Sequence, residues 1–230
     1  MSEVTPILAA IAGGLFPALA WLWFWSREDS HPEPKRLIAL AFIAGMLTVM
    51  IVIPMQKFVA GFILTQTALY TAWSVIEEVM KYAAARAAVL WRHEDDEPID
   101  PIIYMIAVAL GFAALENTLF LMSPLSGSTP LETIMTGNLR FVGATLLHVV
   151  SSAAVGLALA FSFYKSHRVH AWYVLGGVIL ASALHSGFNF LILNSPETQL
   201  FRTFAYVWVG VIAVLAAVEY AKRIHTRRRK

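Results

Sequence analysis

The sequence predicts an all-α protein, a polytopic transmembrane helical bundle of about seven spans. Hydrophobic residues make up 58% of the chain and charged residues only 14%, whereas a soluble domain holds about 25% charged residues. Apolar stretches of about 20 residues, the length that crosses a bilayer, recur along the whole chain. The 230 residues contain no cysteine, which excludes disulfides, thiolate ligands and a cysteine nucleophile. We therefore expect residues 1–230 to form a single membrane-embedded domain.

Each predicted span has its own justification, and the first three differ in how apolar they are. The first is a long apolar run that ends in the tryptophan-rich segment 21–25, which suits a membrane interface. The second has no charged residue, whereas the third carries several, so the third must bury them inside the bundle. These three spans cover residues 6–25, 37–55 and 64–90.

The other four spans are marked by their ends as well as by their composition. Asp100-Pro101 has the pattern of an N-cap followed by proline at the first helical position. Thr129-Pro130-Leu131-Glu132 fits a capping box, which predicts a short interfacial helix ahead of the next span. The remaining two runs are apolar apart from isolated polar groups. The four spans cover residues 101–122, 140–164, 171–193 and 201–221.

The distribution of lysine and arginine predicts the orientation of the bundle. These residues are concentrated in alternate loops and in the basic tail, residues 222–230. Because cytoplasmic loops carry an excess of positive charge, we expect the amino terminus outside and the carboxyl terminus in the cytoplasm. The tail itself is explained as a topology signal, and we expect no nucleic-acid partner for so short a segment.

Four of the spans contain ionisable residues deep inside an apolar sequence: Glu77 and Glu78, then Glu116, His148 and His185. Such groups cost several kcal/mol or more in hydrocarbon and mark functional sites by default. At a rise of about 1.5 Å per residue, the last three lie roughly 8–12 Å below the external surface. The sequence thus predicts one polar centre that opens outward.

The two adjacent glutamates join this centre only on one condition. The third span must begin near residue 66, and residues 54–65 would then form a re-entrant or interfacial segment in which Gly61 breaks the helix. Two more glycines, Gly111 and Gly187, lie beside the polar groups, and we expect both to permit close helix approach.

The spacing within the spans indicates hydrolytic chemistry. The pairs Glu77 and Lys81, His148 and Ser152, and His185 and Asn189 are each four residues apart, so both members lie on one helix face. Two mechanisms fit carboxylates with two imidazoles. Zinc held by Glu and His ligands, with another Glu as base, is one; a buried Glu that activates water without metal is the other.

The order of these groups resembles a known family. Its motifs match Glu77-Glu78-Val79-Met80-Lys81, Phe112 to Glu116-Asn117, then His148, and finally His185 with Asn189. In this order on successive helices they resemble the PrsW family of bacterial intramembrane proteases, which shares a superfamily with the CAAX-prenyl endopeptidases and Abi immunity proteins. The motif-bearing core covers about residues 66–195.

The resemblance implies an endopeptidase of the bacterial cytoplasmic membrane that hydrolyses membrane-anchored proteins, anti-sigma factors among them. Combined with the depth estimate, it predicts cleavage near the external side of the membrane. Glu77 or Glu78 would be the general base, and Asn189 a supporting or oxyanion partner. The predicted zinc ligands, or the acid and oxyanion groups of a metal-free reaction, are Glu116, His148 and His185. For Lys81 we favour a structural ion pair with one of the glutamates.

Two other functions remain open from the sequence. Intramembrane Glu, His and Lys chains also serve ion paths, so an ion- or proton-coupled transporter is one. A non-catalytic binding or immunity member of the same fold is the other.

Overall fold

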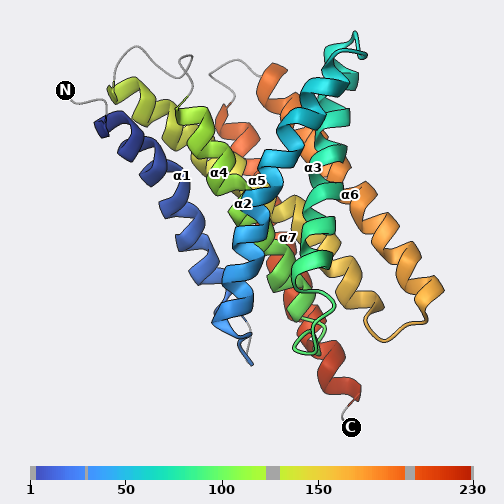
Figure 1. The fold of residues 1–230 in the computed structure, drawn as a ribbon. Coiled ribbons are helices and arrows are strands. Elements are labelled where there is room, and N and C mark those ends of the chain that lie inside the picture. Colours follow the sequence, from blue (N-terminus) through green and yellow to red (C-terminus); the bar gives the residue numbers. More distant parts are fainter. Residues whose placement is uncertain (1–3, 29–30, 123–129, 195–199, 229–230) are drawn as a thin grey trace.

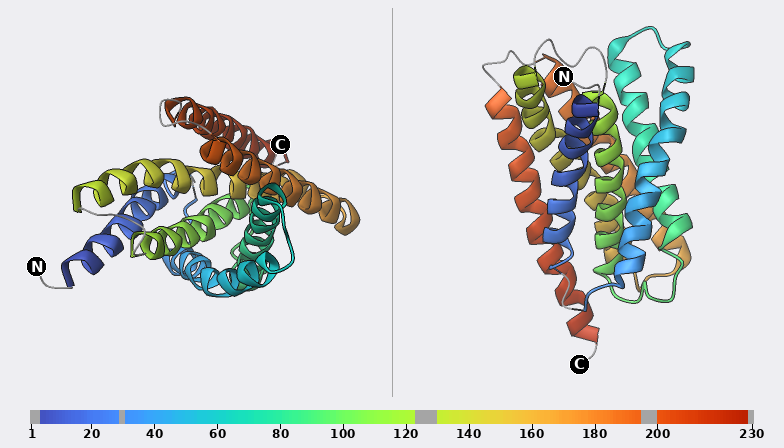
Figure 2. Two further views of the ribbon diagram at one scale, coloured as in Figure 1. Left: turned by 90° about the horizontal axis from the view of Figure 1, so that it is seen from above. Right: turned by 60° about the vertical axis from the view of Figure 1, so that its left-hand side comes forward.

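A computed structural model shows seven α-helices that alternate in direction (Figure 1). It describes residues 4–28, 31–122, 130–194 and 200–228. The start of α1 and the end of α7 lie at opposite ends of the bundle (Figures 1 and 2), as expected for an odd number of helices that alternate in direction. The helices are α1 (Val4–Trp25), α2 (Lys35–Ala60), α3 (Gln66–Ala88), α4 (Asp100–Leu121), α5 (Pro130–Ser162), α6 (His167–Asn194) and α7 (Leu200–Arg228).

Six of the described helices are long and apolar enough to cross a membrane, and together they make this a multi-pass membrane protein. The exception is α3, which carries Glu77, Glu78, Lys81 and Arg86. Glu77, Glu78 and Lys81 are buried inside the bundle, as expected for this span, whereas Arg86 in its last turn is exposed.

Helix α4 forms the centre of the bundle. Its residues from Asp100 to Ala114 are all buried, and it packs against α1, α2 and α5 (Figure 2). A helix that is apolar all round belongs in a core rather than at a surface. The apolar side chains of α4 and of the helices packed against it form the main hydrophobic core of the protein.

Glycines let α2 and α4 approach closely. A Cβ atom at Gly111 would meet the backbone carbonyl oxygen of Phe42, and one at Gly45 would meet that of Val108. The predicted role of Gly111 is therefore confirmed. The same prediction for Gly187 is wrong, because a Cβ there would enter open space.

Several predicted boundaries differ from the observed ones. Residues 54–60 continue α2 instead of forming a re-entrant segment, and the helix ends at Ala60 with Gly61 as its C-cap. A single helix, α5, runs from Pro130 to Ser162, so the prediction of a separate short interfacial helix is wrong. Thr129, the first residue of the predicted capping box, lies outside the described residues. Helix α3 does begin at Gln66, as the polar centre requires.

The start of α4 also differs from the prediction. Asp100 is the first helical residue and Ile99 is the N-cap. The Asp100 Oδ2 atom accepts hydrogen bonds from the backbone N–H groups of Asp96 and Glu97, at 2.9 and 2.6 Å. The Asp100 carboxylate therefore stabilises the turn that precedes α4 rather than capping the helix itself.

Candidate active site

Helices α3, α4, α5 and α6 bring the predicted ionisable residues together. We call Glu77, Glu78, Lys81, Glu116, His148 and His185 the polar cluster. All are buried except Glu116, whose side chain is 34% exposed. The contact between Glu78 and His185 joins residues that are 107 positions apart in the sequence. The prediction of one shared polar centre is confirmed for these residues.

Lys81 is the fully buried cation of the polar cluster. Its Nζ atom lies 2.8 Å from Glu78 Oε1 and 3.7 Å from Glu77 Oε2. It also lies 2.8 Å from His148 Nδ1 and 4.4 Å from the centre of the Phe112 ring. The expected structural ion pair is therefore present, and Lys81 contacts both glutamates as well as a histidine.

The contact with Lys81 determines which nitrogen of His148 carries a proton. An ammonium group only donates hydrogen bonds, so Nδ1 of His148 accepts and Nε2 of the neutral ring carries the hydrogen. That Nε2–H group donates to Glu116 Oε2 at 2.8 Å. The buried cation on one side therefore aims the other side of the imidazole at the exposed carboxylate.

Both carboxylate oxygens of Glu78 accept hydrogen bonds. Its Oε1 atom accepts from Lys81 and from His185 Nδ1, both at 2.8 Å, and its Oε2 atom accepts from Ser152 Oγ at 2.9 Å. Because Nδ1 of His185 donates, its Nε2 atom keeps a free lone pair. A histidine that donates one nitrogen to a carboxylate and presents the other is the usual arrangement of a metal ligand.

Glu77 differs from Glu78 in having one free oxygen. Its Oε1 atom accepts a 2.9 Å hydrogen bond from Gln56 Nε2. Its Oε2 atom is buried, accepts no hydrogen bond from the described residues, and lies 3.7 Å from both His185 Nε2 and Lys81 Nζ. A buried carboxylate oxygen without a donor is costly, and its unused lone pairs face the other members of the polar cluster.

Glu77 Oε2 and His185 Nε2 have free lone pairs that fit a metal ion, whereas a nitrogen of His148 can join them only when it gives up its contact with Lys81 or with Glu116. Glu77, His148 and His185 each offer one ligand atom, and the three atoms lie within 4.8 Å of one another. Two imidazoles and one carboxylate are the donor set of many catalytic zinc sites, which leave a position open for water. Glu116, one of the three predicted ligands, lies outside this group of three but contacts His148.

Residues around the polar cluster tie the helices together. Asn189 Nδ2 donates to Ser74 Oγ at 3.3 Å, which links α6 to α3. Asn117 Nδ2 donates to Thr145 Oγ1 at 3.1 Å, which links α4 to α5. Ser152, four residues after His148 on α5, donates to Glu78 Oε2 and so links α5 to α3.

Sequence reasoning missed Gln56 because residues 54–65 were expected to form a separate segment. The sequence signal that could have identified Gln56 is its position: it is a single amide residue directly after the uncharged apolar run 37–55. Ser74 was missed for another reason. It lies one helical turn before Glu78, where a small hydroxyl residue is ordinary.

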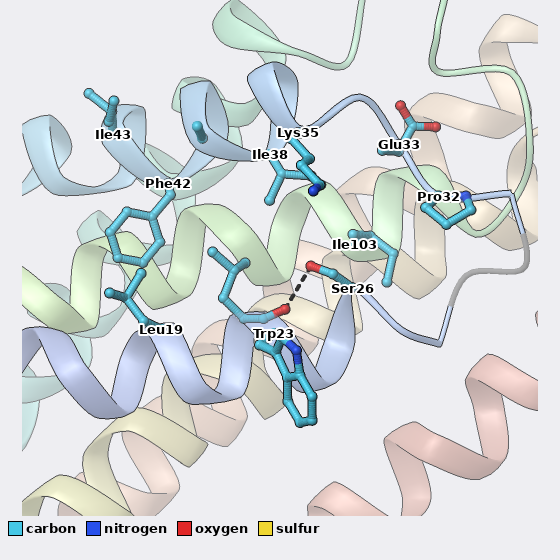
Figure 3. A pocket seen from close by; sticks show the side chains of 12 residues that line it. Leu19, Trp23, Ser26, Pro32, Glu33, Lys35, Ile38, Phe42, Ile43 and Ile103 are labelled. Atoms are coloured by element: carbon cyan, nitrogen blue, oxygen red, sulfur yellow. Dashed lines mark hydrogen bonds between the residues drawn. The ribbon is translucent and has the colours of Figure 1, made fainter.

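An apolar cavity of about 540 Å³ lies elsewhere, between α1 and α2 (Figure 3). Leu19, Trp23, Phe42 and Ile43 are among the residues that line it, and none of its lining residues belongs to the polar cluster. It is therefore separate from the candidate active site.

Comparisons with known proteins agree with this geometry. The family of PrsW intramembrane metalloproteases matches residues 33–218. The protease PrsW of Geobacillus kaustophilus is 26% identical over 226 residues, which cover 94% of this chain and 95% of that protein. The protease PrsW of Bacillus subtilis is 21% identical over 190 residues, with 81% and 84% covered. No solved structure matches the chain.

Proposed function

Because the chain belongs to the PrsW family of intramembrane metalloproteases, we propose that it cleaves membrane-anchored proteins, such as anti-sigma factors, in the bacterial cytoplasmic membrane. Cleavage near the external side follows from the predicted orientation and depth of the polar cluster. The observation that carries the proposal is the buried group of Glu77, His148 and His185, in which no described residue donates a hydrogen bond to the Glu77 Oε2 atom.

We assign His148, His185 and Glu77 as the ligands of a metal ion, with zinc as the expected metal. A bound zinc ion lowers the pKa of a water molecule to about 7 and polarises the scissile carbonyl group. Glu78 and Lys81 hold the two imidazoles in place from the inner side. Glu77 takes the ligand position that the sequence assigned to Glu116, because its Oε2 atom is the one without a hydrogen bond.

Glu116 is then the proton-transfer group. Its carboxylate is partly exposed and touches His148 Nε2, so it borders the position where water and substrate meet the ligands. It accepts a proton as water attacks and returns that proton to the leaving amine. For Asn189 we keep the predicted supporting role, through the orientation of α6 against α3.

The region of α4 below the polar cluster does not favour the transporter alternative. The buried side chains from Met105 to Leu110 are all apolar. An ion path needs polar groups at successive depths, and this stretch of the central helix offers none.

Metal content and cleavage together test the assignment. Wild-type protein, Glu77→Gln, Glu116→Gln and His148→Ala would be purified in detergent, and bound zinc would be measured by mass spectrometry. Substrates would first be identified from membrane proteins that accumulate when Glu77→Gln replaces the wild type in cells. We expect Glu77→Gln and His148→Ala to lose zinc and cleavage, and Glu116→Gln to lose cleavage while it keeps zinc.

Each other outcome has a defined meaning. Loss of zinc in Glu116→Gln but not in Glu77→Gln would exchange the two roles. Unchanged cleavage in all three variants would refute the proposed function.

A further inference from the structure

A residue outside the four motifs holds one of the candidate ligands. Gln56 lies in the last turns of α2, beyond Pro54, and is half-buried. Its side-chain amide donates to Glu77 Oε1 at 2.9 Å. Because an ionised carboxylate only accepts hydrogen bonds, the amide presents its NH₂ group to Glu77.

The backbone of Gln56 is held by a second contact from the same helix. Trp73 Nε1 donates to the Gln56 carbonyl oxygen at 3.2 Å. Trp73 and Glu77 are four residues apart on α3, so both project from one helix face towards α2. The side chain and the main chain of Gln56 are thus both attached to α3, which restricts the position of the amide.

The amide distinguishes the two oxygens of Glu77. Rotation about the terminal torsion of a glutamate is soft, with two equivalent positions. The hydrogen bond from Gln56 occupies Oε1, and the described residues offer Oε2 no hydrogen bond, so it faces His185 Nε2 at 3.7 Å. Lys81 Nζ also attracts Oε2, but at 3.7 Å it makes no hydrogen bond, so among the described residues the Gln56 amide supplies the hydrogen bond that fixes the torsion of the carboxylate.

We propose that Gln56 is a positioning residue for Glu77, which holds the carboxylate so that Oε2 points at the metal position. This inference rests on the proposed function, in which Glu77 is a ligand. Ligating carboxylates are themselves hydrogen-bonded, and loss of such outer partners reduces metal affinity or activity by about 10–100-fold. The same range is expected here.

Gln56→Met tests the amide alone. Methionine has a similar length and keeps the backbone carbonyl that Trp73 contacts, but it lacks the donor. The matched control is Gln66→Met, which removes an exposed glutamine at the start of α3. Zinc affinity would be measured by competition with a chelating dye, and kcat and KM with a fluorescent single-span peptide from an identified substrate.

We expect Gln56→Met to weaken zinc binding by about 10–100-fold and to reduce kcat at subsaturating zinc, with KM changed less than about threefold. Gln66→Met should match the wild type. Trp73→Phe should shift both quantities in the same direction by a smaller factor, because it loosens the backbone of Gln56 and leaves the amide in place. This second variant tests the inference even if Gln56→Met does not fold.

Two results would overturn the inference, and they differ from failure of the proposed function. Zinc affinity within twofold of the wild type in Gln56→Met refutes the positioning role. So does a loss in Gln56→Met that Gln66→Met reproduces. If Glu77→Gln also leaves zinc binding and cleavage unchanged, the proposed function itself is wrong.

Discussion

Replacement of Lys81 by methionine is expected to destabilise the protein strongly. The ammonium group is fully buried and lies 2.8 Å from Glu78 Oε1 and 3.7 Å from Glu77 Oε2. Methionine fills a similar volume without charge, so Lys81→Met leaves two glutamates deep in the bundle without their cation. The contact with His148 Nδ1 is lost as well.

The size of the effect follows from the distances. At an effective dielectric constant of about 20, Coulomb's law gives about 6 kcal/mol for the 2.8 Å pair and about 4 kcal/mol for the 3.7 Å pair. Removing the lysine also removes its own desolvation cost of several kcal/mol. The remainder agrees with the 3–5 kcal/mol that is typical when one partner of a buried ion pair is deleted. For a chain of this size, that loss lowers Tm by roughly 6–20 °C.

Thermal unfolding in detergent, followed by tryptophan fluorescence, measures this shift. Lys165→Met is the control, because Lys165 is exposed in the loop after α5, and its Tm should stay within about 2 °C of the wild type. The double variant Lys81→Met/Glu78→Gln should recover part of the loss, because it removes one unpaired charge. A Tm for Lys81→Met equal to that of the control would refute the view that a charged pair holds the cluster together.

Three further predictions concern the surroundings of the cluster. Ser152→Ala removes the donor to Glu78 Oε2 and should cost about 1–3 kcal/mol of unfolding free energy, with Thr67→Ala as an exposed control; an unchanged Tm would contradict the contact. Gly111→Val should prevent the close approach of α2 and α4, because its Cβ would meet the carbonyl oxygen of Phe42. In size-exclusion chromatography we expect this variant to lose the monodisperse peak of the wild type, whereas the control Gly187→Val should retain it. In the loop before α4, burial raises the pKa of Asp95 from 3.8 to about 7. The folded protein therefore binds a proton more tightly than the unfolded chain, and Asp95 favours folding least above pH 7, after a decline through the window of about pH 4–7. Asp95→Asn should consequently raise Tm at pH 8 and have little effect at pH 4; the reverse order would show that the loop carboxylate is not buried unfavourably.

The sequence determined much of the site because hydrocarbon penalises charge. Glu116, His148 and His185 could be recognised as functional candidates since each interrupts an apolar run at a calculable depth. Residue spacing also predicted where α3 must begin for Glu77 and Glu78 to join them, and the helix starts at Gln66 as required. These inferences use only helix geometry and the cost of burial, which act locally along the chain.

Tertiary structure alone decided which atom faces which. The two glutamates are adjacent and chemically identical. In the structure both oxygens of Glu78 accept hydrogen bonds, from donors on three helices, whereas no described residue donates a hydrogen bond to Glu77 Oε2. The role of Gln56 likewise depends on α2 continuing past Pro54 to reach α3. A side chain's hydrogen-bond partners are set by how helices pack and rotate against one another, and that packing depends on contacts between residues far apart in the sequence.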